Sequence, residues 1–136
     1  MSLAFIDARV EINSVDVSDY VTNVNLPREF EALEDTAMGD VGRSRIAGLE
    51  DSTIGIQFNQ DFANSAIDAT LAAAFGGVIV IKVRPTTASI AATNPEYVGS
   101  YLANQHNPFG NGVGELATTG VSWPLSDPTG IARNTS

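Results

Sequence analysis

Hydrophobic and polar residues alternate along several short stretches of the chain, as they do in half-buried β-strands. The clearest stretch is 53–58, where Ile54, Ile56 and Phe58 share one face and small or polar residues take the other. The run VIVIKVR at 78–84 is β-branched and apolar, and it predicts a central strand. The same pattern predicts strands over 5–13, 20–26, 53–58, 78–84, 97–104, 113–123 and 129–133.

One helix is predicted, over about 65–75. Ser65 can cap its N-terminus, and Asp68, three residues later, completes a pattern that resembles a capping box. Two glycines follow the segment, where helices commonly end. One apolar stripe is formed by Ile67, Leu71 and Phe75.

Short strands with a single helix predict a mainly β fold, either an antiparallel β-sandwich or a barrel, with the helix packed against it. The 136 residues suit one domain, 1–136, and the sequence contains no internal repeat. Hydrophobic residues make up 43% of the chain, which is enough for a core.

The segment 28–51 has no hydrophobic period of either kind, and we predict that it forms a long loop between two strands. Loops of more than about 15 residues are uncommon in compact domains unless they are functional. This segment is therefore the first candidate for a functional site. Its charged residues are Arg28, Glu29, Glu31, Glu34, Asp35, Asp40, Arg43, Arg45, Glu50 and Asp51.

The net charge of −9, from sixteen acidic and seven basic residues, argues against nucleic-acid readout and against binding to anionic membranes. The chain has no cysteine, which excludes disulfides and thiolate sites and favours folding inside a cell. The longest apolar run, near 72–81, is broken by glycines and is too short to span a membrane. No signal peptide is expected at the start of the sequence.

Candidate chemistry is sparse. His106 is the only histidine, and the residues around it contain no nucleophile motif. The glycines of FGNGVGE fit neither a phosphate-binding loop nor a dinucleotide fingerprint. Asp16 and Asp19 lack the spacing of a calcium loop. We therefore expect no enzyme activity, no cofactor and no metal.

The order of short motifs resembles that of the tail tube (major tail) proteins of long-tailed phages. The run DTAMGD at 35–40 leads to Arg43 and Arg45, then to IAGLED at 46–51, and then directly to the strand 53–58. The family has a similar run that closes its long loop and enters a sheet strand, with Pro-Gly-Leu-Lys where this chain has Ala-Gly-Leu-Glu. Further resemblance lies in the helix, in VIVIKVR, in TNPEYVG at 93–99 and in FGNGVG at 109–114.

The resemblance implies a virion structural protein that forms stacked hexameric rings in the phage tail, assembled in the cytoplasm of a bacterial host. The long loop would reach from one ring to the next, where Arg28, Arg43 and Arg45 would pair with carboxylates of adjacent subunits. Its partners would be copies of itself and other tail or head proteins, with no membrane. DNA would pass through an acidic lumen without specific binding, because carboxylates repel phosphates. The candidate lumen acids are Asp7, Glu11, Asp61 and Glu115.

Two other classes of protein stay open from the sequence. A capsid decoration, minor capsid or head–tail joining protein fits the composition equally well. A hydrolase or ligand-binding β-protein would depend on His106.

Overall fold

The computed structural model describes residues 8–62, 66–109 and 112–136, and all the strand pairs in it are antiparallel. The first sheet contains, in spatial order, β10 (Ala132–Asn134), β8 (Glu96–Leu102), β7 (Val78–Arg84), β1 (Arg9–Ile12) and β2 (Val15–Asp16). The second sheet contains β3 (Val21–Asn25), β6 (Thr53–Asn59) and β9 (Thr118–Pro124). A separate two-stranded sheet pairs β4 (Glu29–Glu34) with β5 (Arg45–Asp51). The helices are a 3-10 turn, η1 (Ser18–Tyr20), and α1 (Ile67–Ala74).

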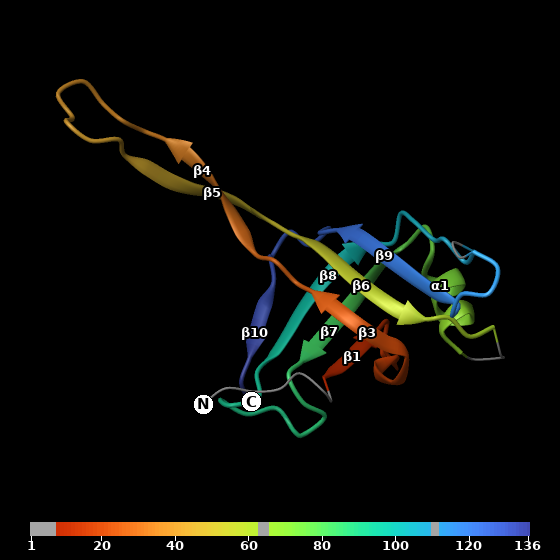
Figure 1. The fold of residues 1–136 in the computed structure, drawn as a ribbon. Coiled ribbons are helices and arrows are strands. Elements are labelled where there is room, and N and C mark those ends of the chain that lie inside the picture. The colour runs from red at the N-terminus through yellow and green to blue at the C-terminus, as the bar shows by residue number, and fades with distance from the viewer. Residues whose placement is uncertain (1–7, 63–65, 110–111) are drawn as a thin grey trace.

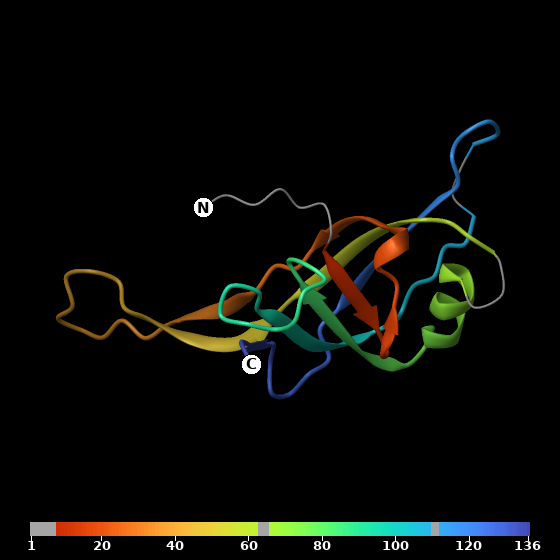
Figure 2. The same ribbon diagram turned by 90° about the horizontal axis from the view of Figure 1, so that it is seen from below.

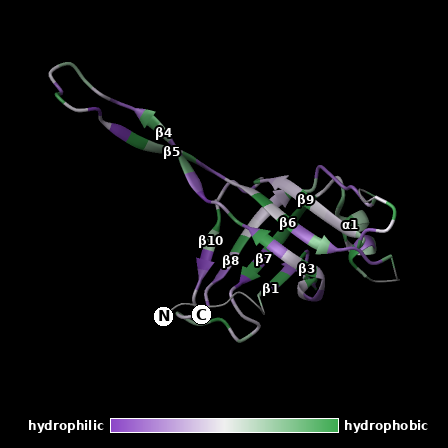
Figure 3. Ribbon diagram, viewed as in Figure 1, coloured by the Kyte–Doolittle hydropathy of each residue, from purple (hydrophilic) through white to green (hydrophobic). Residues whose placement is uncertain are grey.

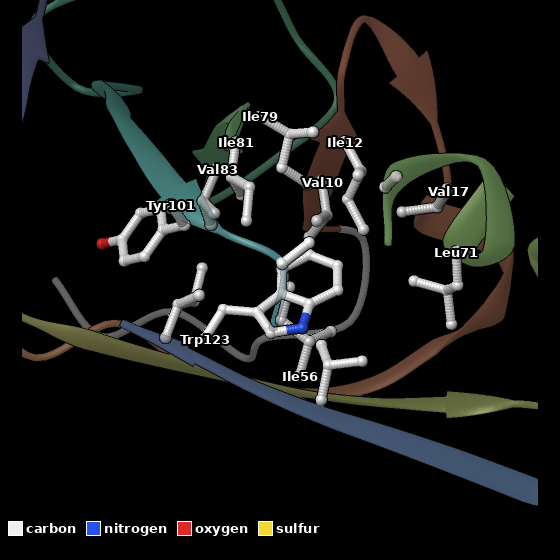
Figure 4. Close-up of a cluster of buried hydrophobic side chains, with 14 of the residues drawn as sticks. Val10, Ile12, Val17, Ile56, Leu71, Ile79, Ile81, Val83, Tyr101 and Trp123 are labelled. Carbon is white, nitrogen blue, oxygen red and sulfur yellow. The ribbon is translucent and has the colours of Figure 1, made fainter. Parts of the chain in front are cut away.

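The hydrophobic core lies between the first and second sheets (Figure 1 and Figure 4). Ile56 from β6, Ile81 from β7 and Trp123 from β9 are all buried within it. The indole N–H of Trp123 donates a hydrogen bond to the carbonyl of Gln105 at 3.0 Å, so its polar atom is also satisfied. Leu71 brings α1 onto the same cluster. The predicted sandwich with one packed helix is confirmed, and no barrel closes among the described strands.

The strongest strand predictions are confirmed with small shifts of their ends, and β7 occupies the centre of the first sheet. The strand predicted over 113–123 is wrong in its first half. Residues 113 and 114 form a turn in which Gly114 has φ +87°, and β9 begins only at Thr118. A glycine with positive φ cannot continue a pleated strand, so its presence outweighs the imperfect alternation.

The predicted helix is shorter than expected. It starts at Ile67 after the N-cap Ala66, and the predicted cap Ser65 lies outside the described residues. Phe75 follows the last helical residue and is 54% exposed, so the buried stripe is limited to Ile67, Leu71 and Ala74. In the described part of the chain, no helix is long and apolar enough to cross a membrane.

The predicted loop 28–51 is instead a β-hairpin that extends away from the body, on the side opposite α1 (Figure 1 and Figure 2). We call residues 29–51 the arm. The arm continues the β3–β6 pair without a change of register. Asn25 lies opposite Gly55, and Glu29, four residues on, lies opposite Asp51, four residues back. One long ribbon therefore runs from the body into the arm.

The hydrophobic pattern did not predict these strands because neither face of the arm packs on the core. Nearly all of its side chains are exposed, and Figure 3 shows hydrophilic and hydrophobic residues interspersed along it. Period-two alternation reports burial of one face, whereas strand pairing needs only backbone hydrogen bonds. A hairpin that is exposed on both sides therefore escapes prediction from the pattern.

Replacing Ile56 with alanine should destabilise the body by about 2–5 kcal/mol, because it leaves a cavity between the two sheets. The measurement is urea unfolding followed by the fluorescence of Trp123, the only tryptophan. The matched control is Thr53→Ala on the exposed face of the same strand, which should change stability by less than about 0.5 kcal/mol. Equal effects of the two changes would contradict the assignment of β6 to the core.

Candidate functional site

We call residues 27–28 and 50–52, where the arm leaves the body, the root. Glu50 fixes the root to the body. One of its carboxylate oxygens, Oε1, accepts a hydrogen bond from the backbone N–H of Ile131 at 3.0 Å and lies 3.4 Å from Nε of Arg28. Arg28 in turn donates to the carbonyl of Ile131 at 3.2 Å. The Glu50 side chain is only 12% exposed, so water competes weakly for these contacts. The two charged residues thus hold the chain just before β10 against the start of the arm.

Ser52 forms the second anchor of the root. Its hydroxyl donates to the carbonyl of Pro27 at 2.6 Å and lies 3.0 Å from the hydroxyl of Tyr101. Its own carbonyl accepts from the N–H of Leu125 at 2.8 Å. Burial raises the pKa of the Tyr101 hydroxyl, so this group stays protonated and able to share a hydrogen bond. The ribbon is therefore tied to β8 and to the end of β9 where it leaves the body.

The tip of the arm, residues 35–44, is closed by its own hydrogen bonds. The N–H of Asp40 donates to the carbonyl of Ala37 at 3.1 Å, and the Asp40 carboxylate accepts from the N–H of Ala37 at 2.8 Å. Gly39 has φ +98°, which favours glycine at this position of the turn. The N–H of Ser44 donates to the hydroxyl of Thr36 at 2.8 Å. Contacts within the tip therefore stabilise its turn without a neighbouring molecule.

Charge is concentrated on the arm. Its seven acidic and two basic residues give it a net charge of −5, out of −9 for the whole chain. Arg43 lies 3.4 Å from a carboxylate oxygen of Glu34, and Arg45 is directly opposite Glu34 in the hairpin. Exposed pairs of this kind contribute about 0–1 kcal/mol. Arg28 and Arg43, which we expected to pair with adjacent subunits, thus already have partners in their own chain.

The arm also exposes large apolar side chains. Met38 and Val41 at the tip are fully exposed, and Leu49 is 80% exposed. Leu33 lies directly opposite Ile46, so these two share a face and remain partly covered by each other. Several apolar side chains exposed on one protruding element are typical of a surface that another molecule covers. The sequence contained them as isolated apolar residues in a charged segment, which is a weak signal.

The three candidate lumen acids that the structure describes, Glu11, Asp61 and Glu115, do not form one cluster in a single chain. Glu11 lies on β1, where it forms an ion pair with Arg9. Asp61 and Glu115 lie in neighbouring loops, which are linked by the hydrogen bond from the N–H of Gln60 to the carbonyl of Ala117 at 3.0 Å. Glu115 is exposed and accepts a hydrogen bond from the N–H of Gly112 at 3.0 Å. Asp7 lies outside the described residues.

His106 lies next to an acid on α1. Its Nε2 atom lies 3.5 Å from Oδ1 of Asp68, and its ring is 6.1 Å from that of Phe75. This contact joins the helix to the segment that follows β8. Among residues 8–62, 66–109 and 112–136, no group of three or more His, Asp or Glu side chains is placed to hold a metal ion.

Comparison with protein families gave no match to the sequence, and comparison with curated proteins gave none either. The arm and its root are therefore interpreted from their own geometry.

Replacing Glu50 with alanine should weaken the root, because the buried N–H of Ile131 loses its acceptor. The expected cost is about 1–3 kcal/mol of unfolding free energy, with faster hydrogen exchange at Ile131. Glu29→Ala is the matched control, since this exposed acid lies on the same ribbon. Unchanged exchange at Ile131 in the Glu50 variant would show that the contacts of Glu50 do not hold the root.

Asp127 gives a prediction about pH. Hydrogen bonds from the side chain and N–H of Thr129 hold the pKa of Asp127 below its ordinary value. Its contribution to stability is therefore present above the ordinary pKa and is lost as the pH falls through the lower, folded value. On acidification below about pH 4, the free energy of unfolding of the Asp127→Asn variant should fall less than that of the wild type, as measured by urea unfolding. An identical pH slope in the two proteins would contradict this role.

Proposed function

We propose that the chain is a self-assembling structural subunit of the phage tail-tube kind, which forms stacked hexameric rings around a lumen for DNA. The observation that carries the proposal is the arm, a preformed ribbon that leaves the body and exposes apolar side chains at its tip. An element of this kind gains its main contacts from neighbours, because its own chain covers little of it.

The second sheet supports ring formation. Among the described strands, β3 and β9 pair only with β6, so both edges of this sheet have unpaired backbone groups. The two edges lie on opposite sides of one subunit, so a contact between unlike edges repeats from copy to copy, and it closes into a ring when the rotation between copies divides a full turn. Both edge strands run antiparallel to β6 and hence parallel to each other.

The charge supports a role in which DNA passes through without being held. Proteins hold DNA when their basic residues neutralise its phosphates and release the counterions bound to them. This chain has only seven basic residues against sixteen acids. In this proposal the subunit belongs to the tail of the virion, is assembled in the cytoplasm of the bacterial host, and contacts other tail or head proteins. An enzyme activity, a cofactor and a membrane play no part in it.

A second candidate is a capsid decoration, minor capsid or head–tail joining protein. The arm favours it too, since a ribbon that protrudes from a β-sandwich can reach across a neighbouring shell protein as well as a ring. Location separates the two: immunogold labelling of virions should mark the tail for the first candidate and the head or its junction for the second.

The decisive test removes the outer part of the arm and keeps the body. Ala32 and Ala47 are directly opposite, so replacing residues 33–46 by Asn-Gly closes the ribbon with a two-residue hairpin turn and keeps Glu50 in place; we call this the armless variant. The wild type should sediment as rings or tubes that negative-stain microscopy resolves. The armless variant should stay monomeric, with the Trp123 fluorescence of a folded body.

Asp19→Asn is the control for this test, because it changes an exposed acid on the body that is not among the candidate lumen acids, and it leaves the arm intact. It should assemble like the wild type. A wild type that is monomeric at every concentration, or an armless variant that assembles normally, would overturn the proposal.

A further inference from the structure

An apolar groove of about 390 Å³ opens between the two sheets where the arm leaves the body. Val24 and Leu26 form its wall on the side of the second sheet. Val83 and Pro85, at the end of β7, form the opposite wall. The core cluster is therefore not sealed at this end of the sandwich, and its apolar surface continues into the groove.

The charged residues that line the groove are both arginines, Arg28 and Arg84. Nε of Arg84 lies 3.5 Å from a carboxylate oxygen of Glu96, yet this buried atom makes no hydrogen bond within the described part of the chain. Arg28 holds Glu50 at 3.4 Å and is 38% exposed at its side chain. Each arginine thus already faces one carboxylate, and the unmet group is the Nε–H donor of Arg84. A partner for this groove therefore combines an apolar group with a hydrogen-bond acceptor such as a carboxylate.

The tip of the arm has this combination. Met38 and Val41 are fully exposed there, and Asp35 and Asp40 lie beside them in the sequence. The thioether side chain of methionine is unbranched and fits irregular apolar gaps. In both views of the fold the tip is the end of the arm that lies farthest from the body (Figure 1 and Figure 2). The groove is lined by residues of the body and by Arg28 at the base of the arm, so the tip cannot occupy the groove of its own chain. A tip that fills this groove must come from a second copy.

We propose that the groove receives the arm tip of a second copy of the chain, with Met38 against the apolar walls and the tip carboxylates facing Arg28 and Arg84. This inference rests on the proposed function and specifies the contact that the arm makes. The two surfaces, tip and groove, lie at different places on one molecule. Each copy therefore offers one tip and one groove, and the contact propagates from copy to copy instead of ending at a symmetric dimer.

Disulfide trapping tests the contact directly, because the chain contains no cysteine. In the double variant Met38→Cys/Leu26→Cys, mild oxidation should produce a ladder of covalent oligomers on a non-reducing gel. A 1:1 mixture of the two single-cysteine variants should produce dimers that stop at two chains, since each chain then carries one half of the contact. Disulfides form only when the Cα atoms approach within about 7 Å, which makes the readout specific.

The matched control is Met38→Cys/Val15→Cys. Val15 is 45% exposed on β2, at an edge of the first sheet and outside the groove. Cross-linking should be roughly tenfold slower or more than in the Leu26 pair, because the contact raises the effective concentration only of thiols that it brings together. The fluorescence of Trp123 checks that each variant is folded.

The outcomes separate this inference from the proposed function. Normal rings or tubes with equal cross-linking in the test and control pairs would overturn the tip-in-groove contact and leave the proposed function standing. A rapid, specific ladder without rings or tubes would support the contact and overturn the proposed tail-tube role. Monomers with no specific cross-link would overturn both.

Discussion

The molecule depends on the register that the strand pair β3–β6 in the body shares with the start of the pair β4–β5 in the arm. Backbone hydrogen bonds within each strand pair, together with the side-chain contacts where the arm leaves the body, fix the direction of the arm, because paired strands cannot swing as a free loop would. The core holds the body half through Ile54, Ile56 and Phe58, while the arm half has no core. The ribbon is thus buried on one face in the body and exposed on both faces in the arm.

Side-chain contacts at the root attach the arm to the body. Glu50 and Arg28 form hydrogen bonds with the backbone of Ile131, and the Ser52 hydroxyl contacts both Pro27 and Tyr101. All of these contacts lie where the strands leave the core. Buried hydrogen bonds to charged groups are among the stronger ones in proteins, and they are costly to leave half made. The arm can therefore present its tip in a defined direction before it meets a neighbour. Preorganisation of this kind lowers the entropy lost on association.

The distribution of charge limits how such arms can associate. The arm carries a net charge of −5 and the remainder of the chain −4, so most surfaces of two copies repel each other. The groove is lined by apolar side chains and two arginines, and the Nε–H of Arg84 has no acceptor among the described residues, which makes it the more favourable place for an acidic tip. Weak single contacts suffice in a repeating assembly, because every copy adds further contacts to the same structure.

Sequence alone determined the mainly β class and the core face of β6, since Ile54, Ile56 and Phe58 alternate only where one face is buried, and it located α1, while it left sandwich and barrel open. It also marked 28–51 as the segment that the core does not explain. Only the tertiary structure decided that this segment is a hairpin and that Glu50 and Ser52 anchor it. The physical reason is that hydrophobic patterning records burial, whereas the arm is made by backbone pairing and by contacts to residues far away in the sequence, such as Ile131.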